Sequence, residues 1–534
     1  MIPLNTLQTL NNARAAIGQQ RFDLAKAILS ELLTMQPQNA MANAILGILQ
    51  SMQGDVAGAI AHLTVACINE PRNAEMQMHL GIAFFLHGNL QKSLHHLKVA
   101  TLLDPNSAVC FYNFGKALKA AKQIDASRSA LNNALIINPN HELAKICLAD
   151  ICTIVGDISS AVSLLRAVLR QNPYQAEAWH ALAALKTYRF CDAESKILHD
   201  ALQSPQITQD QRILLGFALH KARDDAGDYA SAWNVLCEAN AAKRSRIQWD
   251  AHSEIKLVDS VIWTSKRLSI NQKGTFGNKI IFIVSLPRSG STIVEQILAT
   301  HRQVEGGNEL SIINKIIHAE TIRRIKPFPH WVLELKDADW QRMGQAYLEA
   351  TSTLRSTRPL MTDKSLDNWI YLGCIRKMLP GARIVHVYRN PLETCFSCFR
   401  HLFSEGAFYS YDLTDLSEHL VQYYRLMQYF GSVCSDLILD ISYEELVKNS
   451  EAEIRRILRF AGLEYDANCL LPHRTKRHIF STASAAQVRA PLSTDFNHTS
   501  SYSVMLQPLT RELNSRLFGL LPVNRPGFRG GCLV

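Results

Sequence analysis

The residues best suited to chemistry lie in one short stretch, LPRSGST, at residues 286–292. Gly290 allows a sharp backbone turn, and Ser291 and Thr292 can begin a helix whose free N–H groups and positive dipole end attract an anion. Arg288 adds a planar guanidinium that suits phosphate or sulfate. The stretch therefore predicts an anion-binding loop, although an ordinary strand-to-helix turn with a Ser/Thr cap explains the same residues.

The stretch differs from the nucleotide-binding P-loop pattern G-x-x-x-x-G-K-[ST]. Its Gly-Lys pair is missing, and Arg288 stands earlier in the loop than the P-loop lysine would. The missing Gly-Lys pair therefore argues against a nucleotide kinase.

Buried strands of a parallel sheet are expected to position this loop. Residues 280–286 are apolar or small and rich in β-branched types, which is typical of a strand buried on both faces. A helix should follow to about Thr300. Three more strands are expected at residues 359–362, 383–388 and 437–441. In such sheets ligands bind at the carboxyl ends of the strands.

Polar residues follow these strands. The Gly306-Gly307 turn should present Glu309 at the carboxyl edge, and Lys364 follows the second expected strand. Arg389 ends the third strand, and Ser397 lies eight residues later in the next helix, so that both can hold one phosphate. Two simpler interpretations remain open: Glu309 as a helix cap and Lys364 as a surface ion pair.

The N-terminal third is a repeat array. Prolines recur every 34 residues, at Pro37, Pro71, Pro105, Pro139 and Pro173, and small residues keep the same period. This pattern resembles the tetratricopeptide repeat (TPR), a pair of helices. We expect five repeats over about residues 3–173 and a further helix to about Tyr188. Stacked pairs form a solenoid whose groove would bind a peptide or protein, although a rigid spacer or a dimerisation arm fits equally.

The predicted fold is thus an α-solenoid followed by an α/β domain with a parallel sheet flanked by helices. We expect the solenoid at residues 1–188, a connector with one further TPR-like helix pair at 189–278, the α/β domain at 279–518 and a loose tail at 519–534.

Composition narrows the function classes. A net charge of +9 over 534 residues suits an anionic ligand but is too small and dispersed to indicate nucleic acid. No apolar run is long enough to span a membrane, and the start lacks the pattern of a signal peptide. Scattered cysteines within apolar helix patterns favour a cytoplasmic protein. No metal-ligand spacing is found, so no metal is expected.

About residues 279–510 resemble sulfotransferases that use 3′-phosphoadenosine 5′-phosphosulfate (PAPS), of the type related to tyrosylprotein sulfotransferases. The whole chain resembles the bacterial TPR-containing sulfotransferases. The pieces that carry the resemblance occur in the family's order: LPRSGST, Gly307-Asn308-Glu309, Asp363-Lys364, VYRNPLETCFS, SYEEL and SAAQVRAPL.

The resemblance implies roles in binding the donor. Arg288 and the amides of the four following residues (Ser289, Gly290, Ser291 and Thr292) would bind the 5′-phosphosulfate. Arg389 and Ser397 would bind the 3′-phosphate, and Tyr443 would line the nucleotide pocket.

The resemblance also implies roles in catalysis. Glu309 would be the general base that takes the proton of an acceptor hydroxyl, and Lys364 and Ser484 would stabilise charge on the transferred sulfuryl group and the leaving phosphate. The acceptor stays open among tyrosine in a protein or peptide, a saccharide and a small metabolite.

One stretch departs from the family pattern. Residues 494–503 carry His498 and Thr499 where a basic residue near an aromatic one is expected. Arg489 or the basic run at 473–478 are candidates to replace it. The departure keeps a second hypothesis alive, a TPR interaction scaffold whose nucleotide-binding domain is catalytically weak or inactive.

Overall fold

The computed structural model describes residues 4–270, 274–404, 406–474, 498–518 and 520. It divides the chain into two compact units, Met1–Thr153 with Ser159–Asn172, and Ile154–Ile158 with Pro173–Val534. The first unit holds the helix pairs of the repeats, and the second holds further helices and a parallel sheet.

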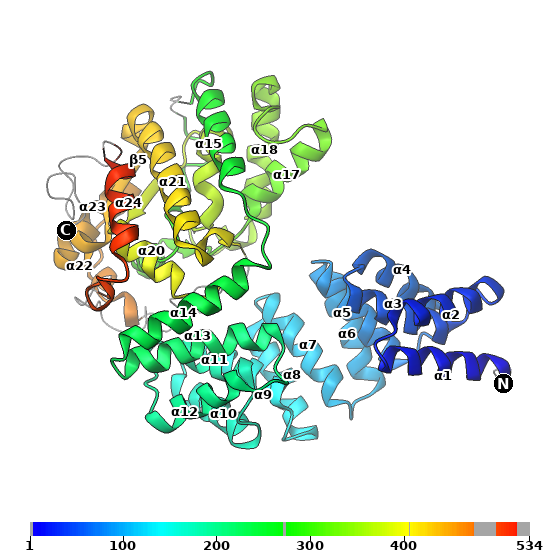
Figure 1. The fold of residues 1–534 in the computed structure, drawn as a ribbon. Helices are drawn as coiled ribbons and strands as arrows, with labels where there is room; N and C mark the ends of the chain where they lie inside the picture. Colours follow the sequence, from blue (N-terminus) through cyan, green and yellow to red (C-terminus); the bar gives the residue numbers. More distant parts are fainter. Residues whose placement is uncertain (1–3, 271–273, 405, 475–497, 519, 521–534) are drawn as a thin grey trace. The chain divides into compact units, whose positions relative to one another are not determined.

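Antiparallel helix pairs form the predicted array (Figure 1). Their bounds are α1 Leu4–Gly18, α2 Phe22–Met35, α3 Ala40–Gln53, α4 Val56–Asn69, α5 Ala74–Leu86, α6 Leu90–Leu103, α7 Ala108–Ala120, α8 Ile124–Ile137, α9 Glu142–Val155 and α10 Ile158–Gln171. The turns within the pairs place Gly54, Gly88 and Gly156 in a left-handed conformation, and Lys122 occupies the equivalent position with φ 61°. The TPR architecture is thus confirmed.

The small residues of the repeat explain its period. A Cβ atom added to the glycine of the first helix of a pair would meet a leucine Cγ of the second at 2.6–2.8 Å, far inside van der Waals contact. The contact recurs in three successive pairs, as Gly47–Leu63, Gly81–Leu97 and Gly115–Leu131. The glycines therefore let the paired helices approach closely.

The second unit opens with α11 Ala176–Ala184, α12 Asp192–Gln203, α13 Gln209–Asp225, α14 Tyr229–Arg244 and α15 Ala251–Ser265. Helices α13 and α14 are the further TPR-like pair. Trp233 of α14 lies against the ring of Phe399 at 5.8 Å, and Asn240 Nδ2 donates to the Phe399 carbonyl at 3.0 Å. The second compact unit begins its main segment at Pro173 and so includes this pair together with the α/β domain.

The sheet has five parallel strands in the order β2-β3-β1-β4-β5. Their bounds are β1 Ile280–Val284, β2 Val304–Gly306, β3 Leu360–Asp363, β4 Arg383–Tyr388 and β5 Ile438–Ser442. Four strands lie within two residues of the predicted ranges. Strand β2 was not predicted, because its three residues run directly into the glycine turn.

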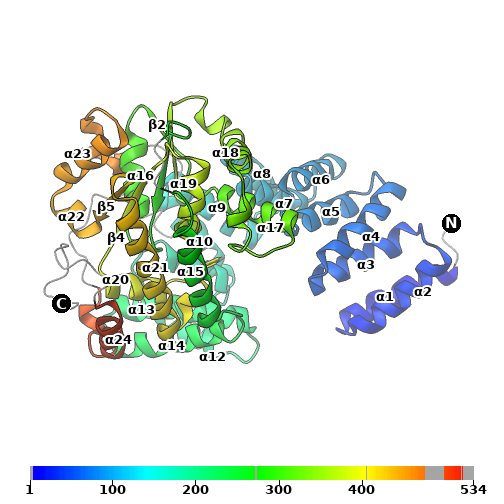
Figure 2. The same ribbon diagram turned by 90° about the horizontal axis from the view of Figure 1, so that it is seen from above.

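Helices cover both faces of the sheet (Figure 2). Helices α16 Ser291–Thr300, α22 Tyr443–Lys448 and α23 Ser450–Ala461 pack on one face. The other face is covered by α15, α18 Asp337–Ala350, α19 Leu372–Met378, α20 Pro391–Phe399, α21 Leu413–Val433 and α24 Gln507–Leu517, with α17 Ile312–Arg324 beside them. Among the described residues, no helix is long and apolar enough to cross a membrane.

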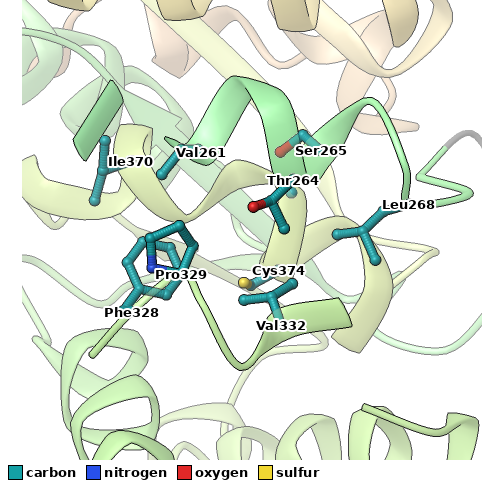
Figure 3. A pocket seen from close by; sticks show the side chains of 10 residues that line it. Val261, Thr264, Ser265, Leu268, Phe328, Pro329, Val332, Ile370 and Cys374 are labelled. Carbon is teal, nitrogen blue, oxygen red and sulfur yellow. The ribbon is translucent and has the colours of Figure 1, made fainter. Parts of the chain in front are cut away.

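A small apolar hollow lies between α15, the start of α19 and residues 328–332 (Figure 3). Its lining includes Val261, Leu268, Val332 and Ile370. None of the predicted site residues lines it, and we assign it no chemistry.

Candidate donor and catalytic site

The strand order collects the predicted site residues at one edge. All five strands are parallel, so their carboxyl ends lie at the same edge of the sheet. Along this edge the residues that follow the strands come in the order Glu309, Lys364, the loop with Arg288, Arg389 and Tyr443. The loop follows the central strand β1, between the Lys364 side and the Arg389 side.

Gly290 shapes the predicted anion-binding loop. It precedes α16 with φ 97°, a left-handed conformation that disfavours other residues. A Cβ atom at this position would meet Tyr443 Cδ2 at 2.4 Å. The glycine thus allows the first turn of α16, with its N–H groups, to approach the Tyr443 ring. Ser289, Ser291 and Thr292 are buried in the same turn.

Arg288 and Arg389 lie side by side. Arg288 also has a left-handed φ, of 67°, and its Nε donates to Ser397 Oγ at 3.1 Å across 109 residues of sequence. Burial lowers the pKa of Arg288 to about 10. This value is still well above neutral pH, so the guanidinium is charged there. Arg389 Nη1 donates to the Arg288 carbonyl at 3.5 Å, and the Arg389 guanidinium lies 5.1 Å from the centre of the Tyr443 ring. Four predicted donor-binding side chains therefore converge.

A carboxylate that the sequence did not single out holds Arg389. Arg389 Nη2 pairs at 3.2 Å with Oε2 of Glu393, which lies four residues further along the chain in the first turn of α20. Glu393 Oε1 accepts from the backbone N–H of Thr499 at 2.9 Å and from its hydroxyl at 2.7 Å. The i,i+4 spacing of Arg389 and Glu393 was the available signal, but nothing in the sequence indicated Thr499 as a partner.

Two of the three predicted catalytic side chains, Glu309 and Lys364, form an ion pair. Lys364 Nζ donates to Glu309 Oε1 at 2.7 Å, and the side chains are 3% and 26% exposed. The backbone N–H of Lys364 donates to the Asn308 carbonyl at 3.0 Å, which ties the two strand ends together. A buried ammonium beside a partly open carboxylate differs from the exposed surface pair that was the simpler interpretation of Lys364.

Glu295 on α16 supports the turn that carries Glu309. Its Oε1 accepts from the Asn308 N–H at 2.8 Å and from the Thr362 hydroxyl at 2.9 Å, and its side chain is fully buried. Gly307 is required beside it, because a Cβ there would meet the Thr362 carbonyl oxygen at 2.2 Å. A single acidic residue within the apolar run of this helix was the sequence signal that we missed.

Asp363 is a structural carboxylate at the end of β3. Its Oδ1 accepts from the Ser365 N–H at 3.0 Å and from Asn368 Nδ2 at 3.1 Å, and its Oδ2 accepts from the Tyr347 hydroxyl at 2.8 Å. Burial raises its pKa. The role of Asp363 is therefore to fix the strand end from which Lys364 projects.

Some predicted positions lie outside the described residues. These are Ser484, Arg489 and the basic run beyond Arg474. Within the described part of the chain, no group of three or more His, Cys, Asp or Glu side chains is placed to hold a metal ion.

Comparisons with known proteins match both parts of the chain. Residues 281–467 match the model of the sulfotransferase family, and residues 10–70 match that of the tetratricopeptide repeat. An uncharacterised protein of Aquifex aeolicus (strain VF5) is 27% identical over 354 residues, which cover 64% of this chain and 46% of that protein.

Protein-tyrosine sulfotransferase A of Caenorhabditis elegans is 23% identical over 211 residues, 36% of this chain and 51% of the relative. These alignments span only about half of each relative's length. Among solved structures, the sulfotransferase domain of the Synechococcus PCC 7002 olefin synthase is 20% identical and covers 47% of this chain and 98% of its own, with a TM-score of 0.36. The two family models show that the chain carries TPR repeats and, at residues 281–467, a sulfotransferase-family domain.

Proposed function

We propose that the sulfotransferase-family domain at residues 281–467 moves a sulfuryl group from PAPS to an acceptor hydroxyl. One observation carries the proposal. The anion-binding loop lies after the central strand, with the Glu309–Lys364 pair on one side and the Arg288–Arg389–Ser397 cluster on the other. The side chains that we propose for acid–base chemistry and for phosphate binding thus lie at one sheet edge.

The residues present suit a donor with two anionic ends. The turn before α16 offers helix N–H groups and Arg288 to the 5′-phosphosulfate. Arg389 and Ser397 suit the 3′-phosphate, a group that ATP lacks. Each charge-assisted hydrogen bond to such a group contributes about 1.5–3 kcal/mol. The pair of arginines therefore gives both affinity and discrimination against ATP.

Glu309 and Lys364 have different proposed roles in the transfer, one as the base and the other in stabilising negative charge. The Lys364 ammonium donates to Glu309 Oε1 at 2.7 Å and so holds in place the carboxylate that would accept the proton of an acceptor hydroxyl. Once Glu309 is protonated, the Lys364 ammonium can stabilise negative charge on the transferred sulfuryl group and on the leaving phosphate. General base catalysis of this kind typically contributes about 10²–10⁴-fold in rate.

The acceptor that we favour is tyrosine in a peptide or protein. The C. elegans relative is named as a protein-tyrosine sulfotransferase, and TPR helix pairs supply a groove suited to a polypeptide. The free cysteines of the described residues suit a cytoplasmic location, which is part of the proposal.

The alternative is a TPR scaffold with a catalytically weak or inactive nucleotide-binding domain. The observation that favours it is the presence of His498 and Thr499 where a basic residue was expected. This alternative predicts donor binding without turnover.

The transfer of ³⁵S from labelled PAPS to tyrosine peptides, saccharides and small phenols separates the two functions. We expect transfer by the wild type and a fall of about 10²–10⁴-fold in Glu309→Gln. Glu305→Gln is the matched control, since Glu305 lies in β2, is 28% exposed and pairs with Arg358 instead of Lys364. An unchanged rate of transfer in Glu309→Gln would contradict the role of Glu309 as the general base. Donor binding by the wild type without transfer to any acceptor would favour the scaffold.

A further inference from the structure

Glu393 links Arg389 to a segment far away in the sequence. One carboxylate oxygen holds the Arg389 guanidinium at 3.2 Å, and the other accepts hydrogen bonds from the backbone N–H and the hydroxyl of Thr499, 106 residues further along the chain. The contacts are buried, with Arg389 and Glu393 side chains 11% and 9% exposed. This carboxylate therefore cannot rotate without breaking contacts on both sides.

The guanidinium of Arg389 is held from three directions. Besides Glu393, it contacts the Arg288 carbonyl at 3.5 Å and lies over the Tyr443 ring at 5.1 Å. Its planar donors match a phosphate only in certain orientations. An arginine that is already fixed loses less side-chain entropy when it binds an anion than a free one does.

We propose that Glu393 and Thr499 are positioning residues for the 3′-phosphate of the donor. Thr499 orients the Glu393 carboxylate, and the carboxylate orients Arg389 toward the phosphate. The inference rests on the proposed function of Arg389. Thr499 stands in the stretch that lacks the expected basic residue, and it acts on the phosphate through Glu393 rather than by a charge of its own.

The positioning role predicts an effect that depends on the 3′-phosphate. PAPS and adenosine 5′-phosphosulfate share the 5′-phosphosulfate and differ only in that group. In calorimetric titrations of the full chain, without an acceptor, Thr499→Val should weaken PAPS binding about three- to tenfold, the worth of one hydrogen bond. Its affinity for adenosine 5′-phosphosulfate should not change, and Thr499→Ser, which keeps the hydroxyl, should restore PAPS binding.

Two further variants sharpen the test. Thr510→Val is the matched control, because its hydroxyl in α24 donates to the Leu506 carbonyl at 3.0 Å and not to Glu393. We expect it to bind both nucleotides as the wild type does. In a Glu393→Ala background, Thr499→Val should cause no further loss of preference for PAPS, since the two residues act in series.

The outcomes separate the inference from the function on which it rests. A wild type that prefers PAPS, together with a Thr499→Val variant of unchanged preference, would overturn the positioning role alone. Equal losses for both nucleotides in Thr499→Val would also overturn it, as a merely structural effect. A wild type that binds neither nucleotide would overturn the proposed function and the inference with it.

Discussion

Replacement of Gly290 by alanine tests the geometry of the anion-binding loop. The added methyl group would sit at φ 97° and meet Tyr443 at 2.4 Å. The left-handed backbone costs a non-glycine residue about 1–2 kcal/mol. Displacement of a packed ring by one carbon costs about 1–3 kcal/mol more. The free energy of unfolding of the second unit should therefore fall by about 2–5 kcal/mol, the sum of these two ranges.

The two contributions separate in a double-mutant cycle with Tyr443→Ala. Without the ring, Gly290→Ala should cost only the backbone strain, about 1–2 kcal/mol, so that the coupling energy equals the packing contribution. Gly227→Ala is the matched control, because Gly227 has φ 78° and nothing within 4 Å of its added Cβ. It should cost the strain alone.

Tryptophan fluorescence during urea unfolding reports this change selectively. All seven tryptophans lie between Trp179 and Trp369, within the second unit. The signal is therefore free of unfolding in the TPR pairs of the first unit. The reasoning is refuted if Gly290→Ala costs no more than Gly227→Ala, or costs the same with and without the Tyr443 ring.

Three further predictions address the catalytic pair, pH dependence and the TPR array. Lys364→Met should lower kcat by about 10²–10³-fold in initial-rate assays with PAPS, as the loss of a transition-state donor does; an unchanged kcat would contradict its role. Burial lowers the pKa of His220 from 6.5 to about 3, and the neutral ring contacts the Ala232 carbonyl at 3.1 Å. The unfolded chain binds a proton at this histidine more readily than the folded chain does, so protonation favours unfolding. The contribution of neutral His220 to the free energy of unfolding is therefore complete above pH 6.5, and it falls by about 2 kcal/mol between pH 7 and pH 5. Urea unfolding should show this slope in the wild type and not in His220→Gln; the same slope in both would contradict the assignment. Removal of residues 1–172 should slow sulfation of tyrosine peptides and leave that of a small phenol unchanged, and equal peptide rates would exclude the TPR groove as an acceptor site.

Much of the fold was predictable because it is periodic or strongly patterned. The 34-residue spacing of Gly47, Gly81 and Gly115 predicted the helix pairs, and each glycine makes the same close contact with a leucine. The apolar run at 280–286 predicted the central strand. Strand β2 was missed since three residues beside Gly307 leave no alternation to detect.

The positions of the candidate site residues at the sheet edge were predictable, but the contacts between them were not. The strand-end rule indicated Glu309, Lys364 and Arg389, yet their neighbours follow from the strand order, which the sequence does not state. Glu295 and Glu393 escaped notice because acidic residues in helices usually face solvent. Only the folded chain brings Thr499 to Glu393, so no local pattern could indicate that contact.

The central claim is that the sheet edge holds a donor with a 3′-phosphate. Thermal unfolding, followed by tryptophan fluorescence, in the presence of 3′-phosphoadenosine 5′-phosphate, AMP or ATP tests it most directly. A ligand at about 100 times its dissociation constant adds roughly 2.7 kcal/mol of stability. The account predicts a shift with the bisphosphate alone, which Arg389→Ala abolishes. A shift with ATP, or with none of the three nucleotides, would contradict it.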